Sequence, residues 1–467
     1  MSRNLILILA ASTALGACAL APKYERPALP VAQTWSTPTP EATGSVTAAD
    51  LDWRQVLIDP RLRGVVDLAL KRNRDLRVAV LNIERARAQY GVQRAELFPA
   101  VNAGASETRS RTPASVSQTG KAFDTEVYSA TIGFTAYELD LFGRVRSLND
   151  AALQSFLATQ ETSRSARISL IAETANAWLT LAADQDRLAL ARDTLRTREE
   201  SLRLVQQQVD GGVGSLADLR NAQILAETAR SDVAVYTAQV AQDRNALTLL
   251  AGGDTPADLL PNGGLADAQI LADLPAGLPS DVLVRRPDVL AAEHQLRGAN
   301  ADIGAARAAF FPRISLTGST GTTSTALDGL FKSGTGAWSF VPQISLPIFA
   351  GGANVANLRG AEASRDIAVA TYERTVQAAF REVSDALSVR ATVADRVAAQ
   401  QRLVTAAASA QDLSRQRRDA GIDSALTVLD AQRTLYTAQQ GLITARLARA
   451  TNLVTLYKTL GGGAPAA

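Results

Sequence analysis

The sequence predicts a chain of mixed α and β structure, mainly helical, in which one unit of about 210 residues occurs twice. Three observations lead to this fold class. Landmark residues recur in the same order at nearly constant offset. Two long runs contain no proline and almost no glycine. Two shorter segments alternate apolar and polar residues. Together they predict long helices joined to a small number of strands in each repeat.

The duplication is visible as pairs of matching residues. Pairs that lie 213 positions apart are Asp75 and Asp288, Gly91 and Gly304, and Phe98-Pro99 and Phe311-Pro312. The stretch Leu139 to Phe142 matches Leu346 to Phe349 at an offset of 207. We therefore predict a first repeat over 51–255, a linker over 256–280, a second repeat over 281–460 and a flexible tail over 461–467.

Two very long helices are expected at equivalent places in the repeats. Arg144 to Asp210 contains neither proline nor glycine, and the matching run from Ala353 to Ala420 contains only Gly360. Each run would form a helix of roughly 65 residues, about 100 Å long. Apolar residues at coiled-coil spacing, interrupted by charges, indicate water-exposed helices rather than transmembrane ones. Shorter helices are expected from Pro60 to Leu97 and from Asp281 to Ala309.

Each long helix is followed by a glycine turn and a returning helix, giving helical hairpins over 144–250 and 353–460. The two turns have related sequences, and Ser215 and Ser424 are suitable N-caps for the returning helices. Asp218, three residues after Ser215, favours a capping box. The turn residues are Gly212, Val213, Gly214, Ser215 and Leu216 in the first repeat, and Gly421, Ile422, Asp423 and Ser424 in the second.

Strand periodicity appears between the short and long helices of each repeat, over 100–137 and 313–349. Tyr128, Ala130, Ile132, Phe134 and Ala136 alternate with small polar residues, and Trp338 to Ile348 repeats the pattern. Each segment holds two strands of about ten residues, the length that a tilted membrane strand needs. Soluble hairpins packed on a core would show the same alternation. Four strands cannot close a barrel, so strands embedded in lipid would require several chains to share one barrel.

The N-terminus predicts export and lipid attachment. Residues 1–17 combine Arg3 with a short apolar stretch, which is typical of a signal peptide. The stretch Leu15-Gly16-Ala17-Cys18 resembles a lipobox, which implies an N-acyl and S-diacylglycerol lipid on Cys18, and Ala19 favours sorting to the outer membrane. A plain secretory peptide with an incidental cysteine is the alternative. Residues 18–50, rich in proline, are expected to form an extended strap.

Composition argues against several classes of function. The formal net charge is +2, so no basic surface points to nucleic acid. With one histidine and one cysteine, the chain offers no His or Cys cluster for a metal ion. A site made of carboxylates alone is the open alternative, although the sequence has no EF-hand spacing. No phosphate-binding glycine loop is present. We therefore expect no enzyme, no metal and no cofactor apart from the lipid.

Considered together, these features resemble the outer-membrane factor family, the trimeric exit ducts of tripartite efflux pumps, over essentially all of the mature chain. Several motifs carry the resemblance. They are Trp53, Asp59-Pro60, Asn73, Asp75-Leu76, Phe98-Pro99, Leu139 to Gly143, Arg285 to Asp288, Phe311-Pro312, Leu429 to Arg433, Leu456 to Lys458 and Gly461-Gly462. The resemblance implies a lipid-anchored homotrimer in the outer membrane, with a 12-stranded β-barrel and a periplasmic α-helical barrel.

The resemblance also implies partners and site residues. Substrates would pass from an inner-membrane pump of the resistance-nodulation-division (RND) type through a periplasmic adaptor, or membrane fusion protein, into a passive duct. The glycine turns match the adaptor-docking tips, while Asp430, Arg433 and Leu426 match the family's periplasmic gate. The alternatives are an ordinary intrahelical ion pair, which contributes about 0.2–0.5 kcal/mol, and simple turn chemistry.

Two other readings of the whole chain remain open at the level of sequence. The same duct would serve type I protein secretion or metal-ion export. A structural coiled-coil lipoprotein, or a periplasmic adaptor, belongs to a different class, and the paired strand segments argue against both.

Overall fold

The computed structural model describes residues 20–32, 34–35, 52–262, 264–265 and 280–462. The chain divides into two compact units. The first comprises Met1–Ala28, Asn82–Gln160 and Ala291–Glu373, and the second comprises Leu29–Leu81, Glu161–Leu290 and Arg374–Ala467. Each unit therefore takes equivalent segments from both sequence repeats, and neither unit corresponds to one repeat.

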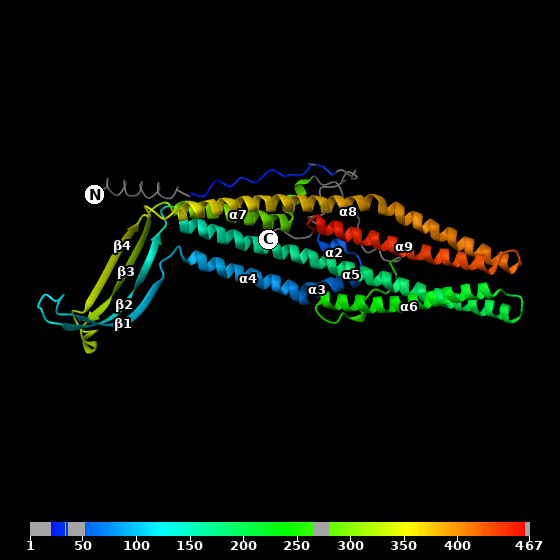
Figure 1. The fold of residues 1–467 in the computed structure, drawn as a ribbon, viewed down its shortest axis with the longest axis horizontal. Coiled ribbons are helices and arrows are strands. Elements are labelled where there is room, and N and C mark those ends of the chain that lie inside the picture. The colour runs from blue at the N-terminus through cyan, green and yellow to red at the C-terminus, as the bar shows by residue number, and fades with distance from the viewer. Residues whose placement is uncertain (1–19, 33, 36–51, 263, 266–279, 463–467) are drawn as a thin grey trace. The chain divides into compact units, whose positions relative to one another are not determined.

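The first unit contains an antiparallel sheet of four strands in the order β1-β2-β3-β4 (Figure 1). The strands are β1 (Val101–Thr112), β2 (Phe123–Leu139), β3 (Arg313–Ser324) and β4 (Gly336–Ser345). Strands β1 and β2 form the hairpin of the first repeat, and β3 and β4 form that of the second. Pairing of β2 with β3, for example Ile132 with Thr320, joins the two hairpins into one sheet.

The structure corrects the predicted strands at two places. The register between β2 and β3 shifts between Phe134 and Tyr137, and Ala136 has a positive φ of 53°. Ala136 therefore does not continue the alternation that begins at Tyr128. Strand β4 ends at Ser345, short of the predicted Phe349. Pro347 lacks the N–H that a continued ladder would need, so the apolar residues after Ser345 lie outside the strand.

Helices α5 (Arg144–Asp210) and α8 (Ala353–Asp419) confirm the two long helices. Each has 67 residues and is about 100 Å long at 1.5 Å per residue. Helix α6 (Leu216–Ala251) returns after α5, and α9 (Ala425–Thr459) returns after α8, which gives a helical hairpin in each repeat (Figure 1).

The predicted helix from Pro60 to Leu97 is two helices, α3 (Pro60–Arg72) and α4 (Arg74–Ala95), preceded by the short α2 (Trp53–Val56). Asn73 causes the break because it serves both ends. Its N–H donates to the carbonyl of Ala69 at 2.9 Å, and its Oδ1 accepts from the N–H of Leu76 at 2.9 Å. Its Nδ2 donates to the carbonyl of Leu250, which ties the break to the end of α6.

The helix expected from Asp281 begins later, at Pro287, as α7 (Pro287–Ala308). The preceding residues form the 3₁₀ helix η3 (Ser280–Arg285). Proline suits the first position of an α-helix and disfavours helical geometry in the residue before it, so the α-helix starts there. Two further 3₁₀ turns are η2 (Ala257–Leu259) and η4 (Leu327–Gly329).

The core of the second unit forms around α3. Leu62, Val65, Val66 and Ala69 on one face of α3 are fully buried. Gly252 ends α6 in the left-handed conformation, with φ of 74°, and a Cβ there would lie 2.4 Å from the carbonyl oxygen of Arg72. Only glycine fits this close approach. Within the described residues, every helix lacks an apolar stretch long enough to cross a bilayer.

Candidate gate and docking region at the helical tips

The first tip is a tight turn built around one helix carbonyl. After Asp210, the N–H groups of Val213 and Gly214 both donate to the carbonyl of Gln208, at 3.0 and 2.8 Å. Ser215 then caps α6 by accepting from the N–H of Ala217 at 3.1 Å. The predicted N-cap is confirmed, but Ser215 bonds Ala217 and not Asp218, where a capping box would place the bond.

Apolar side chains project into solvent at this tip. Val213 is 84% exposed, and Leu216 is also well exposed. The turn itself needs Gly212, which has a φ of 78°. The backbone is therefore satisfied internally, and the exposed apolar side chains remain available for a partner.

The second tip has the same backbone plan with an added ion pair. Gly421 has a φ of 76°, and the N–H of Ile422 donates to the carbonyl of Arg417 at 2.9 Å. Ser424 caps α9 by accepting from the N–H of Thr427. The Arg417 guanidinium clamps Asp423 through two hydrogen bonds, Nε to Oδ2 and Nη2 to Oδ1, both 3.0 Å. Ile422 remains exposed.

Sequence reasoning missed Arg417. A basic residue in the last turn of a helix is a recognised C-terminal signal, because it complements the free carbonyl groups. Its pairing with Asp423 crosses the turn, however, and depends on where the chain reverses. The matching positions in the first repeat are Gln208 and Gly214, which form no such pair.

The three candidate gate residues share one exposed face of α9. Leu426, Asp430 and Arg433 are spaced four and three residues apart, which places them on one side of a helix. Leu426 is half exposed. The Asp430 and Arg433 side chains are 58% and 67% exposed, and Arg433 Nη2 donates to Asp430 Oδ1 at 2.5 Å. Within the single chain, the pair is therefore the intrahelical contact that the sequence left as an alternative.

The adjoining face of α9 is buried against the first hairpin. Leu429, next to Asp430, packs in a cluster with Val205 of α5 and with Leu219 and Ala222 of α6. Partly buried apolar residues at Leu202, Val209, Leu225 and Ala425 extend this cluster. The cluster fixes the rotation of α9, and it therefore turns Asp430 away from the first hairpin.

A row of polar contacts continues the seam beyond this cluster. Tyr436 of α9 donates its hydroxyl hydrogen to Asp232 of α6 at 2.8 Å, and its ring lies 5.0 Å from the Arg198 guanidinium. Gln440 donates to the Tyr236 hydroxyl oxygen at 3.2 Å. Burial and the Asp232 carboxylate raise the pKa of Tyr436, so its hydroxyl stays protonated and able to donate.

These residues were not singled out from the sequence. The available signal was their spacing: Tyr436 and Gln440 follow Leu429 by seven and eleven residues, and so continue its face of the helix. The seam joins residues about 200 positions apart, and no local pattern names both sides of it.

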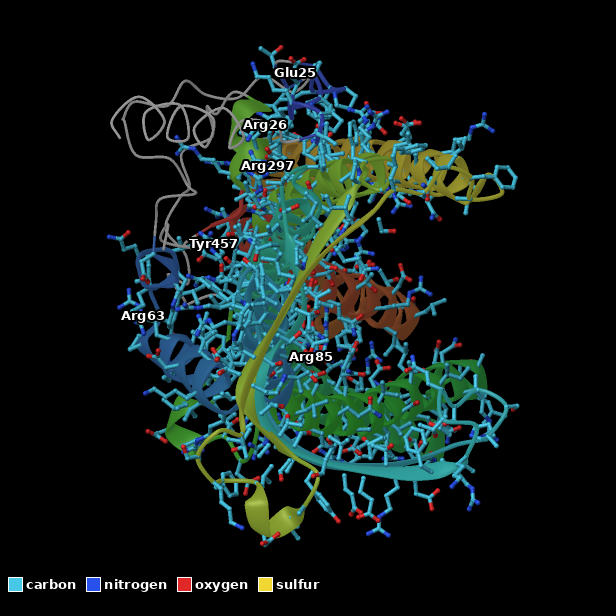
Figure 2. All side chains as sticks on the ribbon, turned by 90° about the vertical axis from the view of Figure 1, so that its left-hand side faces the viewer. Glu25, Arg26, Arg63, Arg85, Arg297 and Tyr457 are labelled. Atoms are coloured by element: carbon cyan, nitrogen blue, oxygen red, sulfur yellow. The ribbon has the colours of Figure 1, made fainter. Side chains whose placement is uncertain are left out.

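In the first unit, α7 holds the N-terminal segment. Glu293, only 2% exposed, accepts from Tyr24 and from the Arg26 guanidinium, with Arg26 Nη2 at 2.8 Å from Oε2. Arg297 also binds Glu293 and lies beside Arg26 (Figure 2). Burial alone would raise the pKa of Glu293, but its bonds to Arg297 and Arg26 outweigh burial and hold the pKa below its ordinary value.

Further contacts continue along the same side of α7. Asn300 donates to the carbonyl of Pro22 at 2.7 Å, and Arg307 donates to that of Leu20 at 3.3 Å. Residues 20 to 26 of the predicted strap are thus bound along one helix face. Cys18, the predicted signal peptide, residues 36–51, most of the linker and residues 463–467 lie outside the described residues.

The only histidine forms a hydrogen bond with a side chain of α5. His294 Nδ1 lies 2.7 Å from Gln154 Oε1. Among the residues that the structure describes, no three His, Cys, Asp or Glu side chains are grouped as a metal ion would require.

The sequence and the fold are similar to those of known proteins. The profile of the family described as "Outer membrane efflux protein" matches residues 65–253 and 278–462. The toluene efflux pump outer membrane protein TtgC of Pseudomonas putida is 49% identical over 466 residues, covering 99% of this chain and 96% of TtgC. The antibiotic efflux pump outer membrane protein ArpC of Pseudomonas putida matches to the same extent.

Solved structures agree in fold. The open state of the MtrE outer membrane channel of Neisseria gonorrhoeae superposes with a TM-score of 0.87 at 42% identity, covering 96% of this chain and 98% of MtrE. These matches confirm the predicted fold class, the outer-membrane location and the efflux function. The chain belongs to the outer membrane efflux protein family, a family of transport channels.

Proposed function

We propose that this protein is the passive exit duct of a tripartite efflux system and works as a homotrimer. The four-stranded sheet, with an open edge on either side, is the observation that carries the proposal. In the described chain, β1 pairs only with β2 and β4 only with β3. Lipid offers no hydrogen bonds to an open edge, so each edge needs a strand from another chain.

Three copies would bring together twelve strands and close the sheet into one barrel. Strands β1 and β4 have 12 and 10 residues, which is enough for a tilted strand to cross a bilayer. Each chain has two helical hairpins, and the hairpins of the three copies would continue as a helical tunnel in the periplasm.

The partners follow from this arrangement. Substrates would enter from an inner-membrane pump of the RND type through a periplasmic adaptor, which docks on the exposed tip residues Val213, Leu216 and Ile422. Relatives named for efflux of toluene and of antibiotics support small organic compounds as the cargo. They favour this cargo over secreted proteins or metal ions, which the same kind of duct would also fit. The duct itself carries out no reaction.

An N-acyl and S-diacylglycerol lipid on Cys18 is part of the proposal. Two or more acyl chains give stable anchoring, because each buried CH₂ contributes about 0.8 kcal/mol. The bound strap segment from Leu20 to Arg26 supports it, since α7 holds the chain directly after the proposed anchor.

The proposed gate is the exposed face of α9 that carries Leu426, Asp430 and Arg433. Three copies of Asp430 around a narrow axis would repel one another and favour cations. Arg433 would pair with Asp430 of a neighbouring copy and hold the tips inward. Opening would move the second hairpin as a rigid body, with the adaptor contacting the open state better than the closed one.

Conductance in planar bilayers tests the gate. Asp430→Ala combined with Arg433→Ala removes both charges, and we expect a several-fold higher single-channel conductance with a weaker preference for cations. The matched control is Asp193→Ala with Arg196→Ala. These residues form an exposed Asp–Arg pair three residues apart on α5. Conductance should not change in this control. Equal conductance of the gate variant and the native protein would contradict the gate.

A further inference from the structure

The two faces of the sheet differ in where they carry charge. Ile132 of β2, Thr320 of β3 and Trp338 of β4 lie side by side in the register, so they share one face. Phe340 and Ile344 continue this apolar face along β4, and in a barrel it contacts lipid, so it is called the lipid face. The charged residues on the lipid face, all near the turn between β1 and β2, are Glu107, Arg109, Arg111, Asp124 and Glu126.

The opposite face, called the lumen face, is mostly small and polar and carries little charge. Its hydroxyl and amide side chains are Asn102, Ser106, Thr108, Ser110, Thr112, Thr125, Ser129, Thr131, Ser315, Thr317, Ser319, Thr323, Ser339, Gln343 and Ser345. Within the four described strands, only Glu138 and Arg313 place a charged side chain on this face. A barrel shared by three copies would turn the lumen face to the passage, so the role of these two residues rests on the proposed trimeric duct.

A bulge in β2 brings Glu138 to the lumen face. From Phe134 to Tyr137, β2 advances three residues while β3 advances two. The extra residue reverses the alternation, because neighbouring residues of a strand point to opposite faces. Without the bulge, Glu138 would lie on the lipid face. With it, Glu138 pairs with Ser315 and shares the face of Arg313.

Glu138 holds two arginines at the end of the sheet where the strands join the helices. Arg144, in the first turn of α5, donates from Nε to Oε1 and from Nη2 to Oε2, both at 2.8 Å. Arg313, the first residue of β3, donates only to Oε2, from Nη2 at 2.6 Å and from Nε at 3.2 Å. The Glu96 carboxylate also attracts Arg144. Because Arg313 shares a carboxylate that Arg144 already occupies, its positive charge is only partly neutralised.

The two arginines also differ in exposure. The Arg144 side chain is 25% exposed, whereas the Arg313 side chain is 59% exposed. Three copies would repeat Arg313 around the base of the barrel, where a fixed charge attracts ions of opposite sign over about 10 Å at 0.1 M salt. We propose that the three copies of Arg313 form a positive collar at the base of the lumen, which favours the passage of anions and of substrates that carry an anionic group.

Glu138 acts as the positioning residue of this collar. Its carboxylate holds the Arg313 guanidinium and offsets part of its charge, so loss of the carboxylate leaves two arginines without their shared partner. Neutralising Arg313 should therefore shift ion selectivity toward cations, and neutralising Glu138 should shift it toward anions. An ion pair with a purely structural role gives no such opposition, because both substitutions break the same contact.

The test is the reversal potential of full-length channels in planar bilayers under a gradient of KCl. The parent protein carries Asp430→Ala and Arg433→Ala, so that the charges of the proposed gate do not mask the collar. Arg313→Gln should shift the reversal potential toward that of potassium, and Glu138→Gln should shift it toward that of chloride. Both shifts should shrink near 1 M KCl, where the screening length falls to about 3 Å.

Two further variants separate charge from structure. Arg313→Lys keeps the positive charge and should keep the selectivity of the parent. Arg111→Gln is the matched control, because it removes one exposed positive charge from the lipid face of the same sheet, and its reversal potential should equal that of the parent. If Arg313→Gln does not assemble, Glu138→Gln decides the matter by a shift toward chloride or by none.

The outcomes distinguish the collar from the duct. Equal reversal potentials for Arg313→Gln and Arg111→Gln would overturn the collar, as would shifts of Arg313→Gln and Glu138→Gln in the same direction. In either case the channels still form, and the proposed duct stands. Absence of channels from the parent protein would contradict the duct itself, and the collar with it.

Discussion

Two buried carboxylates, Asp184 on α5 and Asp243 on α6, lie within hydrogen-bonding reach of each other. Arg187 pairs with Asp184 at 2.5 Å, and Gln239 donates to Asp243 Oδ1 at 3.0 Å. Oδ2 of Asp243 is buried without a hydrogen-bond partner. The pKa of Asp243 is raised to about 6, mainly by burial. Asp184 contributes to this increase, while Gln239 and Arg187 act in the opposite direction.

This pKa gives a stability prediction with a definite sign. The folded protein binds the Asp243 proton more tightly than the unfolded chain, whose ordinary pKa is 3.8. The stabilisation is therefore complete below about pH 4 and is lost as the pH rises through 6. We expect Asp243→Asn to raise the melting temperature at pH 7.5 by a few degrees and to reduce the difference between pH 5 and pH 7.5.

Calorimetry of the detergent-solubilised protein at both pH values measures this effect. Asp218→Asn, a partly exposed acid on the same helix, is the control and should keep the native pH dependence. If Asp243→Asn shows the same pH dependence as the control, the buried carboxylate does not titrate in this range.

At the scale of elements, the two helical hairpins share a plan and differ in how their tips are held. Gly212 and Gly421 make the turn, and Ser215 and Ser424 cap the returning helix. These features were predictable because turn and cap chemistry is local. The Arg417–Asp423 clamp was not, because its two residues meet only after the chain has reversed.

The tips carry a prediction about docking. Val213→Asp together with Ile422→Asp places charges where the proposed adaptor contact is apolar, so we expect loss of adaptor co-purification and of drug efflux in cells. The backbone of both turns is bonded internally, and the trimer should therefore form normally. Val235→Asp, an exposed valine on α6 away from the tips, should leave both readouts unchanged. Full adaptor binding by the double variant would place the docking surface elsewhere.

At the scale of the whole molecule, the repeated pattern predicted the class of fold. It did not predict where individual elements end or which residues connect the two repeats. Long helices were visible as runs without proline, since exclusion of proline is a property of each residue. The break at Asn73 and the end of β4 at Ser345 depend on contacts and ladders that extend beyond a local window. The seam between Tyr436 and Asp232 joins the two repeats, and nothing in either repeat alone identifies it.

The exposed sheet predicts how the protein behaves when extracted. Trp338 is 80% exposed in the single chain, and Phe340 and Ile344 on the same face are also exposed, as lipid contact would require. We expect a trimer that migrates intact without heating and as a monomer after boiling. Cys18→Ser should keep this behaviour while the intact mass loses the acyl chains. A water-soluble monomer from Cys18→Ser would contradict the shared barrel, and an unchanged mass would contradict lipid attachment.

Pairing of β2 with β3 and packing of Leu429 against Leu219 both connect one sequence repeat to the other. The unit that was duplicated is therefore not the unit that folds. A half-length ancestor would have formed the equivalent contacts with a second molecule, as the subunits of a dimer do. The fusion turned an association between molecules into a contact within one, with no dependence on concentration. The two copies were then free to diverge, and only α9 now carries charges at the positions of Asp430 and Arg433, where α6 has Asn221 and Ile224.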